Sequence, residues 1–244
     1  MILKNASFSY DNNGWIFHGI HGEIESGEIL CIMGSNGTGK TTLIKCIAGI
    51  LPLTMGTIEI EPTKRLSYVP QRKYLNLSYS VPDFICFGRY SLQSFFAKPT
   101  KEDYEKTDLV MELLHIEKLR NRTINEISGG ELQMCYIAKA LVSDPHIIIL
   151  DEPESNLDMK NQRKIIQLLK TLSQEGKTII LNTHYLNYAS SIADRCLLMG
   201  DDGHVFGPKE DVLTEENMEH YFGVPIKKTF LNMEGKTFPQ YIFL

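Results

Sequence analysis

The chain has 244 residues, 43% of them hydrophobic, and a formal net charge of −5. That length can bury the core of one large α/β domain, or of a core domain with a smaller insert, and the acidic balance excludes a general basic surface for nucleic acid. The sequence has no run of about 18 apolar residues and no apolar N-terminal leader, so we expect neither a membrane span nor a signal peptide. Its five scattered cysteines form no C-x-x-C pair and predict reduced core thiols in a cytosolic protein.

The N-terminal part predicts a small antiparallel sheet that leads into a buried strand. Apolar residues alternate with polar residues and glycines over residues 1–30, as in short paired strands. Ile29–Met33 is apolar throughout and predicts a buried strand, and Thr42–Ala48 predicts a helix that ends at Gly49. A glycine-rich loop lies between this strand and this helix.

That loop, Gly34-Ser35-Asn36-Gly37-Thr38-Gly39-Lys40-Thr41-Thr42, fits the pattern G-x-x-x-x-G-K-[ST] of a phosphate-binding loop, or P-loop. Glycines let backbone N–H groups surround phosphate oxygens, the helix start adds partial positive charge, and Lys40 adds a full charge. The Thr41 hydroxyl can reach a magnesium ion. An ordinary glycine-rich turn is the alternative, but the flanking strand and helix favour nucleotide binding. The loop alone does not distinguish a kinase from a GTPase or a motor.

The middle of the chain predicts short strands and then a helical insert. Thr57–Ile60 and Leu66–Val69 are expected to be strands. Between about residues 72 and 143 the pattern changes from that of short strands to that of helices. Thr100 and Asp103 form an N-cap pair ahead of a helix that places Tyr104, Thr107, Val110, Met111 and Leu114 on one face, and Glu131–Val142 predicts another helix. We therefore expect one domain, 1–244. Within it, residues 1–71 and 144–244 form the nucleotide-binding core with its β subdomain, and residues 72–143 form a helical subdomain.

The second half alternates strands with helices, as a parallel sheet requires. Ile147–Leu150 is an aliphatic strand of the kind that a sheet covered on both faces contains. The further predicted elements are a helix over Lys160–Gln174 and strands over Thr178–Leu181, Arg195–Met199 and Val205–Phe206. The tail, residues 224–244, predicts a hairpin whose turn lies at Asn232–Gly235.

Two carboxylates, in Asp151-Glu152-Pro153, follow the aliphatic strand directly. The carboxyl end of a parallel strand lies at the edge of the sheet where ligands bind. Asp151 could join a magnesium shell, and Glu152 could orient and activate water at a γ-phosphate. Without a P-loop these residues would most simply end a strand. With one, they favour phosphoryl transfer.

Three weaker signals have simple structural explanations. Ser128-Gly129-Gly130-Glu131 fits a helix capping box, although capping does not need the two glycines, which would let the helix start approach an anion closely. A lone histidine such as His184 is usually structural, and a lone glutamine such as Gln71 usually lies on the surface. Both follow predicted strands, however, and His184 could stabilise the charge of a transferring phosphoryl group.

Taken together, the order of these motifs resembles that of the ABC transporter ATPases over essentially the whole chain. In order, the sequence carries the P-loop, Gln71, Ser128-Gly129-Gly130-Glu131-Leu132-Gln133, Asp151-Glu152, Ser155-Asn156-Leu157-Asp158 and His184. The resemblance implies an α/β fold, with a P-loop NTPase (RecA-like) parallel-sheet core, an N-terminal antiparallel β subdomain and a helical insert. It also implies ATP hydrolysis with Mg²⁺ as cofactor.

The resemblance also implies roles for single residues. Tyr10 matches the aromatic residue that stacks on adenine, Gln71 the Q-loop residue that contacts magnesium and links to the membrane partner, and His184 the switch histidine. The implied ATP-binding residues are Tyr10, Asn36, Gly37, Thr38, Gly39, Lys40, Thr41 and Thr42. The implied catalytic residues are Glu152, His184, Gln71 and Lys40, and the implied magnesium ligands are Thr41, Gln71 and Asp151.

Some positions depart from the family pattern. Ser128 to Glu131 match the signature motif, but Ile127 stands in place of the usual leucine, and Asp158 matches the D-loop aspartate. Glu154 stands where the family usually has Thr or Ser, and Tyr185 stands where many members have Asp. These last two positions lie close to the predicted chemistry.

The mechanism that the resemblance implies needs two copies of the chain. Each ATP lies between the P-loop of one copy and Ser128, Gly129, Gly130, Glu131 and Asp158 of the other. ATP holds this homodimer closed and its hydrolysis opens it, which drives a polytopic membrane permease that docks on the helical subdomain. A substrate-binding protein takes part indirectly, and no nucleic acid is involved. The chain is expected to lie on the cytoplasmic face of the plasma membrane.

Local strings favour one group of importers within the family. Val81-Pro82-Asp83, Gly88-Arg89-Tyr90, His184-Tyr185-Leu186-Asn187-Tyr188-Ala189 and the tail are similar to the importers of iron–siderophore, haem and cobalamin type. Molybdate-type relatives share these strings, so the cargo stays open, and an exporter ATPase is a further alternative. A DNA-repair or ribosome-associated ATPase fits less well, because no heptad run separates Lys40 from Ser128 and the chain has one ATPase domain. A nucleotide kinase would leave the Ser-Gly-Gly-Glu string and His184 unexplained.

Overall fold

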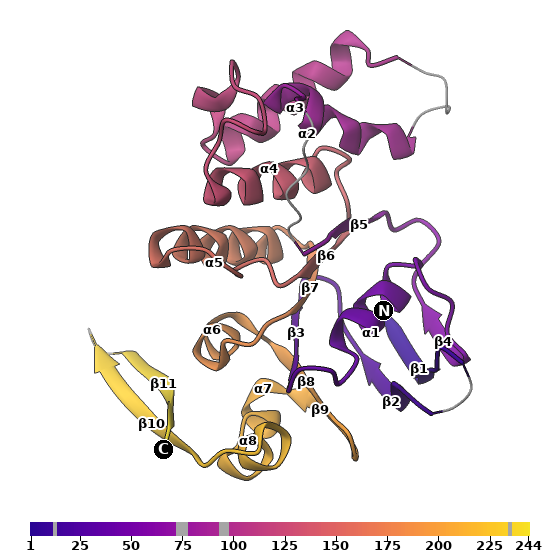
Figure 1. Cartoon of the computed structure of the whole chain (residues 1–244), viewed down its shortest axis with the longest axis vertical. Coiled ribbons are helices and arrows are strands. Elements are labelled where there is room, and N and C mark those ends of the chain that lie inside the picture. The colour runs from indigo at the N-terminus through magenta and orange to yellow at the C-terminus, as the bar shows by residue number, and fades with distance from the viewer. Residues whose placement is uncertain (12–13, 72–77, 93–97, 234–235) are drawn as a thin grey trace.

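The computed structural model describes the whole chain except residues 12–13, 72–77, 93–97 and 234–235. Figure 1 shows a central sheet with helices on both sides, a group of helices at one end and a two-stranded hairpin toward the other. None of the helices in the described part of the chain has the length and apolar character that spanning a bilayer demands.

The central sheet has six strands in the order β5-β6-β7-β3-β8-β9. These strands are β3 (Ile29–Gly34), β5 (Leu66–Val69), β6 (Ile147–Asp151), β7 (Thr178–Asn182), β8 (Arg195–Gly200) and β9 (Gly203–Pro208). Neighbours from β5 to β8 pair in parallel, and β9 pairs antiparallel with β8. Both faces of the sheet are covered, which explains why every residue of β3, β6 and β7 is buried.

Alternate residues of the central strands supply two separate cores. Leu30 and Ile32 of β3 belong to the core with α1 (Lys40–Ile47) and the N-terminal sheet. Cys31 and Met33 belong to the core with α5 (Met159–Gln174) and α6 (Leu186–Ile192). The N-terminal sheet pairs β1 (Ile2–Phe8) antiparallel with β2 (Phe17–Glu23) and β4 (Met55–Glu59). Figure 1 shows α1 with this sheet on one side of the central sheet and α5 and α6 on the other.

The helical group lies beyond the β5 edge of the central sheet (Figure 1). It comprises α2 (Val81–Cys86), the 3-10 helix η1 (Phe87–Leu92), α3 (Lys101–Leu113), the 3-10 helix η2 (Glu117–Leu119) and α4 (Gly129–Leu141). Thr100 and Asp103 form the capping box that starts α3, as the sequence predicts. Thr107 and Met111 are fully buried, but Tyr104 is 37% exposed and its hydroxyl donates to Asp83 at 2.7 Å. The predicted apolar face of α3 is therefore narrower than the sequence indicates.

The C-terminal part follows β9 with α7 (Lys209–Val212), α8 (Glu215–Phe222) and the antiparallel pair β10 (Ile226–Met233) and β11 (Lys236–Phe243). Tyr241 holds β11 against the body of the molecule. Its backbone N–H donates to Asn187 Oδ1 at 2.9 Å, and its hydroxyl donates to the Leu213 carbonyl at 2.9 Å.

The fold class predicted from the sequence is confirmed, and the predicted strands and helices are present with ends shifted by at most two residues. The helices α2, α6, α7 and α8 were not predicted from the sequence. None of them exceeds eight residues, which is too short for a helical period to stand out. The limits of the helical subdomain, 72–143, stay a prediction. Residues 72–77 and 93–97 of that subdomain, and residues 234–235 of the hairpin, lie outside the described residues.

Candidate active site

The topology brings three strand ends of the central sheet together. β7 lies between β3 and β6, with Asn182 opposite both Ile32 and Asp151. The P-loop leaves β3, Asp151 ends β6, and His184 follows β7. Ligands of α/β sheets bind at such carboxyl ends. Residues that are far apart in the sequence thus meet at one edge of the sheet.

The P-loop adopts a conformation that only its glycines permit. Gly34, Gly37 and Gly39 have φ angles of 141°, 87° and 88°. A Cβ on Gly34 would lie 2.1 Å from the carbonyl oxygen of Met199. Gly39 is the N-cap of α1 and provides no side-chain cap, so the first N–H groups of the helix are left for an anion.

The side chain of Lys40 lies inside the P-loop. Its side chain is buried, and Nζ donates to the carbonyl oxygens of Gly34 at 2.9 Å and Ser35 at 2.6 Å. Burial lowers the pKa of Lys40, and the charges of Glu152 and Asp151 partly offset that effect. A cation held inside a glycine-rich loop is suited to a polyphosphate.

Asp151 is buried and accepts three hydrogen bonds. Thr41 Oγ1 and Asn182 Nδ2 donate to its Oδ1 at 3.1 and 2.7 Å, and the Tyr68 hydroxyl donates to its Oδ2 at 3.2 Å. Burial, followed by the charge of Asp151, raises the pKa of Tyr68, so the hydroxyl remains a donor. Tyr68 and Asn182 were not predicted from the sequence. A polar residue at the end of a buried strand is the signal that could have found Asn182.

Glu152 joins side chains from separate segments of the chain. Its Oε1 lies 2.7 Å from His184 Nε2, and its Oε2 accepts hydrogen bonds from Gln71 Nε2 at 2.8 Å and Ser155 Oγ at 2.7 Å. Its backbone N–H donates to Asn182 Oδ1 at 2.7 Å. Its φ of 49° lies in the left-handed region, a strain that functional sites often contain. Two of the predicted catalytic residues, Gln71 and His184, therefore contact a third, Glu152, and Ser155 adds a contact that was not predicted from the sequence.

These contacts decide the charge of Glu152. Burial alone would raise the pKa of its carboxyl, but hydrogen bonds from Ser155, His184 and Gln71 outweigh burial and hold the pKa below its ordinary value. The group is therefore ionised at neutral pH and can accept a hydrogen bond from water.

A cavity of about 290 Å³ opens beside these groups. It is lined by Tyr10, Ile16, Asn36, Gly37, Gly39, Lys40, Thr41, Thr42, Glu152 and His184. A larger cavity of about 460 Å³ has Thr38 in its wall but includes neither Lys40 nor Glu152. The smaller cavity is therefore the one whose chemistry suits a nucleotide.

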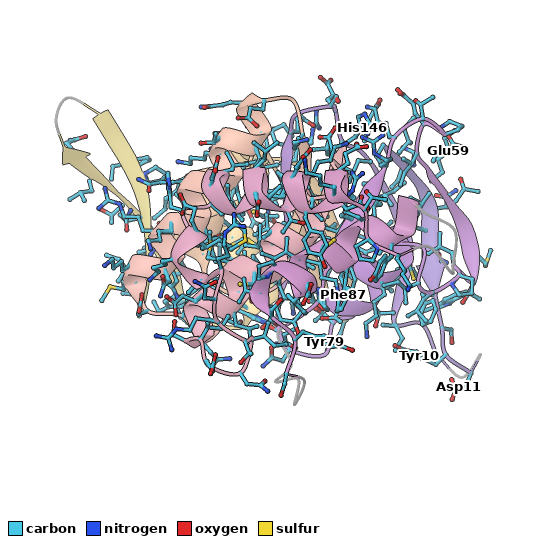
Figure 2. All side chains as sticks on the ribbon, turned by 90° about the horizontal axis from the view of Figure 1, so that it is seen from above. Tyr10, Asp11, Glu59, Tyr79, Phe87 and His146 are labelled. Atoms are coloured by element: carbon cyan, nitrogen blue, oxygen red, sulfur yellow. The ribbon has the colours of Figure 1, made fainter. Side chains whose placement is uncertain are left out.

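Tyr10 stands at the rim of the smaller cavity. Its side chain is 65% exposed, and its hydroxyl lies 3.3 Å from Thr42 Oγ1. Its ring packs edge-on against Phe8, with 4.8 Å between the centroids. Figure 2 shows Tyr10 next to Asp11 at one edge of the molecule, where a flat ring is accessible to a base.

The oxygen atoms around Thr41 suit a hard divalent cation. Hydroxyl, carboxylate and amide oxygens are the donors that Mg²⁺ prefers, and Thr41, Asp151 and Gln71 supply one of each kind. Thr41 and Asp151 are in contact. Gln71 reaches Glu152 through its nitrogen, so its amide oxygen is not used by that bond. The donor chemistry of the three predicted ligands therefore fits magnesium.

The residues predicted to act on a second copy cap helices in their own chain. Ser128 Oγ accepts from the Glu131 N–H at 3.3 Å, and Glu131 Oε2 accepts from the Ser128 N–H at 3.1 Å. A hydrogen bond from Lys118, followed by that from Ser128, lowers the pKa of Glu131 to about 2. Asp158 caps α5 by accepting from the Asn161 N–H at 2.8 Å.

The signature segment also packs against α5. A Cβ on Gly130 would lie 2.3 Å from Asn161 Nδ2, so this glycine is required for packing whatever else it does. Among the described residues, none from Ser128 to Glu131 lines the cavity of Tyr10 and Lys40. The chain by itself therefore does not bring its signature motif to its own P-loop cavity.

Comparison with known proteins identifies the relatives of this arrangement. The ABC transporter family model matches residues 17–155. The molybdate import ATP-binding protein MolC of Haemophilus influenzae is 33% identical over 92% of this chain and 88% of its own length. The chelated iron transport system membrane protein YfeB of Yersinia pestis is 29% identical over 96% of this chain and 82% of its own. A solved structure of an inward-facing ABC transporter of metal-chelate type matches with a TM-score of 0.94 and 32% identity, over 100% of this chain and 96% of that one.

Proposed function

This chain belongs to the ABC transporter family and is an ATPase of that family, and from this premise we propose that two copies of it power an importer of metal chelates. The observation that carries the proposal is the contact of Glu152 with Gln71 and His184 beside the P-loop cavity. A water-orienting acid, two polar partners and a phosphate cradle are what hydrolysis of a γ-phosphate needs.

In this proposal the residues of the site divide the work of ATP hydrolysis. Lys40 and the N-terminus of α1 balance the negative charge of the phosphates, and Tyr10 stacks on the adenine. The ionised Glu152 orients the attacking water and accepts its proton, while His184 and Gln71 hold that carboxylate in place. Thr41, Asp151 and Gln71 would hold a magnesium ion, which would supply charge neutralisation at the phosphates.

The second copy supplies the other half of each site. The signature motif presents an N-capped helix start with two glycines, a surface that suits an anion, yet it lies outside the P-loop cavity of its own chain. A head-to-tail dimer would bring Ser128, Gly129 and Gly130 of one copy to the ATP of the other. ATP would then hold the dimer closed, and its hydrolysis would open it.

The test of the catalytic assignment is Glu152→Gln. The amide keeps the size of the side chain but is not an anionic base, so hydrolysis should slow by a factor on the order of 10²–10³. Binding of ATP, measured by calorimetry, should persist. Lys40→Ala should instead lose binding, and Glu175→Gln, an exposed glutamate at the end of α5, should change neither. Normal turnover by the Glu152→Gln protein would refute the assignment.

The membrane partner is proposed to dock on the helical group, where aromatic side chains are exposed. Tyr79 and Tyr90 are each 42% exposed. Phe87 lies between them, with ring centroids at 4.8 Å from Tyr79 and 5.3 Å from Tyr90. Lys139 Nζ lies 5.9 Å from the Phe87 ring. Figure 2 shows Tyr79 and Phe87 close together on this part of the molecule. Exposed aromatic clusters of this kind favour a protein interface.

The cargo proposed is an iron chelate, haem or a cobalamin-type compound. The sequence strings and the similarity to chelated-iron and metal-chelate transporters support it, whereas the similarity to a molybdate ATPase supports the alternative. The partner and the cargo can be tested together. A polytopic membrane protein should co-purify with the tagged chain, and ATP hydrolysis by the complex should rise with a metal chelate rather than with molybdate. Such a complex would place the chain at the cytoplasmic face of the membrane.

A further inference from the structure

Glu154 is a buried acid next to the candidate active site. Its side chain is 1% exposed, and it lies two residues after Glu152 on the segment that leads into α5. The hydroxyl of Thr183, which is also fully buried, donates to Glu154 Oε1. The same hydroxyl oxygen accepts from the backbone N–H of Tyr185 at 3.0 Å. Two consecutive hydrogen bonds therefore connect Glu154 to Thr183 and Thr183 to Tyr185, the two residues that flank His184.

The hydrogen bonds indicate where the protons lie. Thr183 Oγ1 already accepts from Tyr185, so its own hydrogen is free to point at Glu154. Glu154 Oε2 is buried and has no hydrogen-bond partner among the described residues. The hydroxyl of Tyr188 is likewise buried and has no hydrogen-bond partner among them. An ionised carboxylate with one unpaired buried oxygen is costly, and a neutral carboxylic acid with its proton on Oε2 costs less, because it leaves an unpaired hydroxyl there rather than an unpaired charge.

The surroundings of Glu154 contain acids rather than bases. The titratable groups that face it among the described residues are Glu152 on its own segment, Tyr188 of α6 and Cys31 of β3. None of them is a cation. Burial first, and then the charge of Glu152, raise the pKa of Glu154 to about 7, although the Thr183 bond acts in the opposite direction. The neutral form therefore dominates in mildly acidic solution.

We propose that Glu154, as a neutral carboxylic acid, is a positioning residue that holds the Thr183–Tyr185 segment so that His184 stays in contact with Glu152. The inference rests on the proposed function, because His184 matters only if Glu152 orients water there. A threonine or serine at position 154 would be too short to make the same bridge to Thr183. The role is therefore tied to this residue of this chain.

The kinetic test compares variants that keep or remove the bridge. Glu154→Gln keeps an acceptor of the same length and is neutral at every pH, so at pH 6.5 its kcat should stay within about twofold of the unmodified protein. Glu154→Leu removes the acceptor, and kcat should fall about tenfold while the KM for ATP changes less than about twofold. Thr183→Val should have the same effect, and combining it with Glu154→Leu should add nothing.

The pH profile separates positioning from simple packing. Between pH 6.5 and 8.5 the unmodified protein ionises Glu154. The buried charge has no partner at Oε2, so it should disturb the packing of the Thr183–Tyr185 segment, and the ratio of kcat for Glu154→Gln to that of the unmodified protein should rise. Glu175→Gln, which changes an exposed glutamate, should give a constant ratio. A constant ratio for Glu154→Gln, or a Glu154→Leu protein with unchanged kcat, would overturn the proposal.

A second measurement does not depend on hydrolysis. In protein labelled with ¹³C at glutamate side-chain carboxyls, the NMR signal missing from Glu154→Gln belongs to Glu154. That signal should titrate near pH 7. A signal already ionised at pH 5 would overturn the proposal while leaving the ATPase assignment intact. A protein that titrates as expected but hydrolyses no ATP would instead refute the proposed function.

Discussion

At the scale of single residues, the candidate site is held together by side chains that each have more than one partner. Glu152 accepts from Gln71 and Ser155 and contacts His184, and Asp151 accepts from three donors. The pKa of Glu152 is lowered and the pKa of Glu154, two positions away, is raised. Burial is the largest single cause for both, but for Glu152 the hydrogen bonds from Ser155, His184 and Gln71 together outweigh it, whereas for Glu154 it prevails.

The raised pKa of Glu154 predicts a specific pH dependence of stability. The folded protein binds this proton up to about pH 7, whereas the unfolded chain releases it near the ordinary value of 4.5. Between these values the native state holds more protons, so the free energy of unfolding falls as pH rises and levels off above 7. The loss amounts to about 3 kcal/mol as an upper estimate.

Glu154→Gln removes this proton and should remove the dependence. Urea unfolding at pH 5, 6, 7 and 8 should show a stability advantage of Glu154→Gln over the unmodified protein that grows up to about pH 7. Glu175→Gln should run parallel to the unmodified protein at every pH. A Glu154→Gln curve that is also parallel would mean that Glu154 is ionised in the folded state.

The sequence predicts the candidate site as far as its motifs reach. The P-loop and the pair Asp151-Glu152 could be placed because a continuous string carries each of them. Tyr68, Asn182 and Ser155 could not, because their roles depend on which strands are neighbours and on a turn geometry that no local string encodes. The position of Glu154 was visible as a departure, but its burial and its bond to Thr183 appear only in three dimensions.

At the scale of elements, the string Gly88-Arg89-Tyr90 has a structural explanation in the packing of η1. A Cβ on Gly88 would lie 1.8 Å from the Lys139 carbonyl oxygen, so η1 approaches the backbone of α4 as closely as a glycine allows. Arg89 Nε donates to Asp103 Oδ1 at 2.7 Å, with 12% and 2% of the two side chains exposed. Asp103 also belongs to the capping box of α3, so one ion pair joins η1 to the start of α3.

Loss of Arg89 should therefore destabilise the helical group. Arg89→Ala leaves the carboxylate of Asp103 buried without its cation, which should lower the free energy of unfolding by about 3–5 kcal/mol. Denaturant unfolding measures this change. Arg163→Ala, which removes an exposed arginine of α5, should change stability by less than about 0.5 kcal/mol. Equal stabilities of the two variants would show that the ion pair contributes nothing.

The elements that the sequence predicts well are those with a strong local signal. β6 and β7 each contain an uninterrupted aliphatic run, α3 begins with a capping box, and α5 has a long apolar stripe. The order of strands in the sheet could not be predicted in this way. β3 lies between β7 and β8 because it pairs with residues more than a hundred positions away in the sequence. Pairing between strands that are far apart in the sequence produces no local pattern in a single sequence.

At the scale of the whole molecule, one chain carries two half-sites on different parts of its surface. Ser35 and Ser128 are both exposed, one in the P-loop and one at the start of α4. All five native cysteines are buried, so cysteines introduced at the surface would be the reactive ones. These facts allow the proposed head-to-tail dimer to be tested directly.

A chain with Ser35→Cys and Ser128→Cys, combined with Glu152→Gln so that bound ATP persists, should form a covalent dimer with a short bis-maleimide. The dimer should appear on a denaturing gel with ATP and magnesium and be strongly reduced without them, because ATP brings the P-loop of one copy to the signature motif of the other. Each single cysteine variant is the control: alone it cannot link Ser35 to Ser128, so a dimer from either one would show a different interface. Mixing the two single variants should restore the cross-link, since in a head-to-tail pair the two cysteines come from different chains. If the double variant stays monomeric with ATP while calorimetry shows that ATP binds, the nucleotide is held by one chain alone and the shared site is wrong.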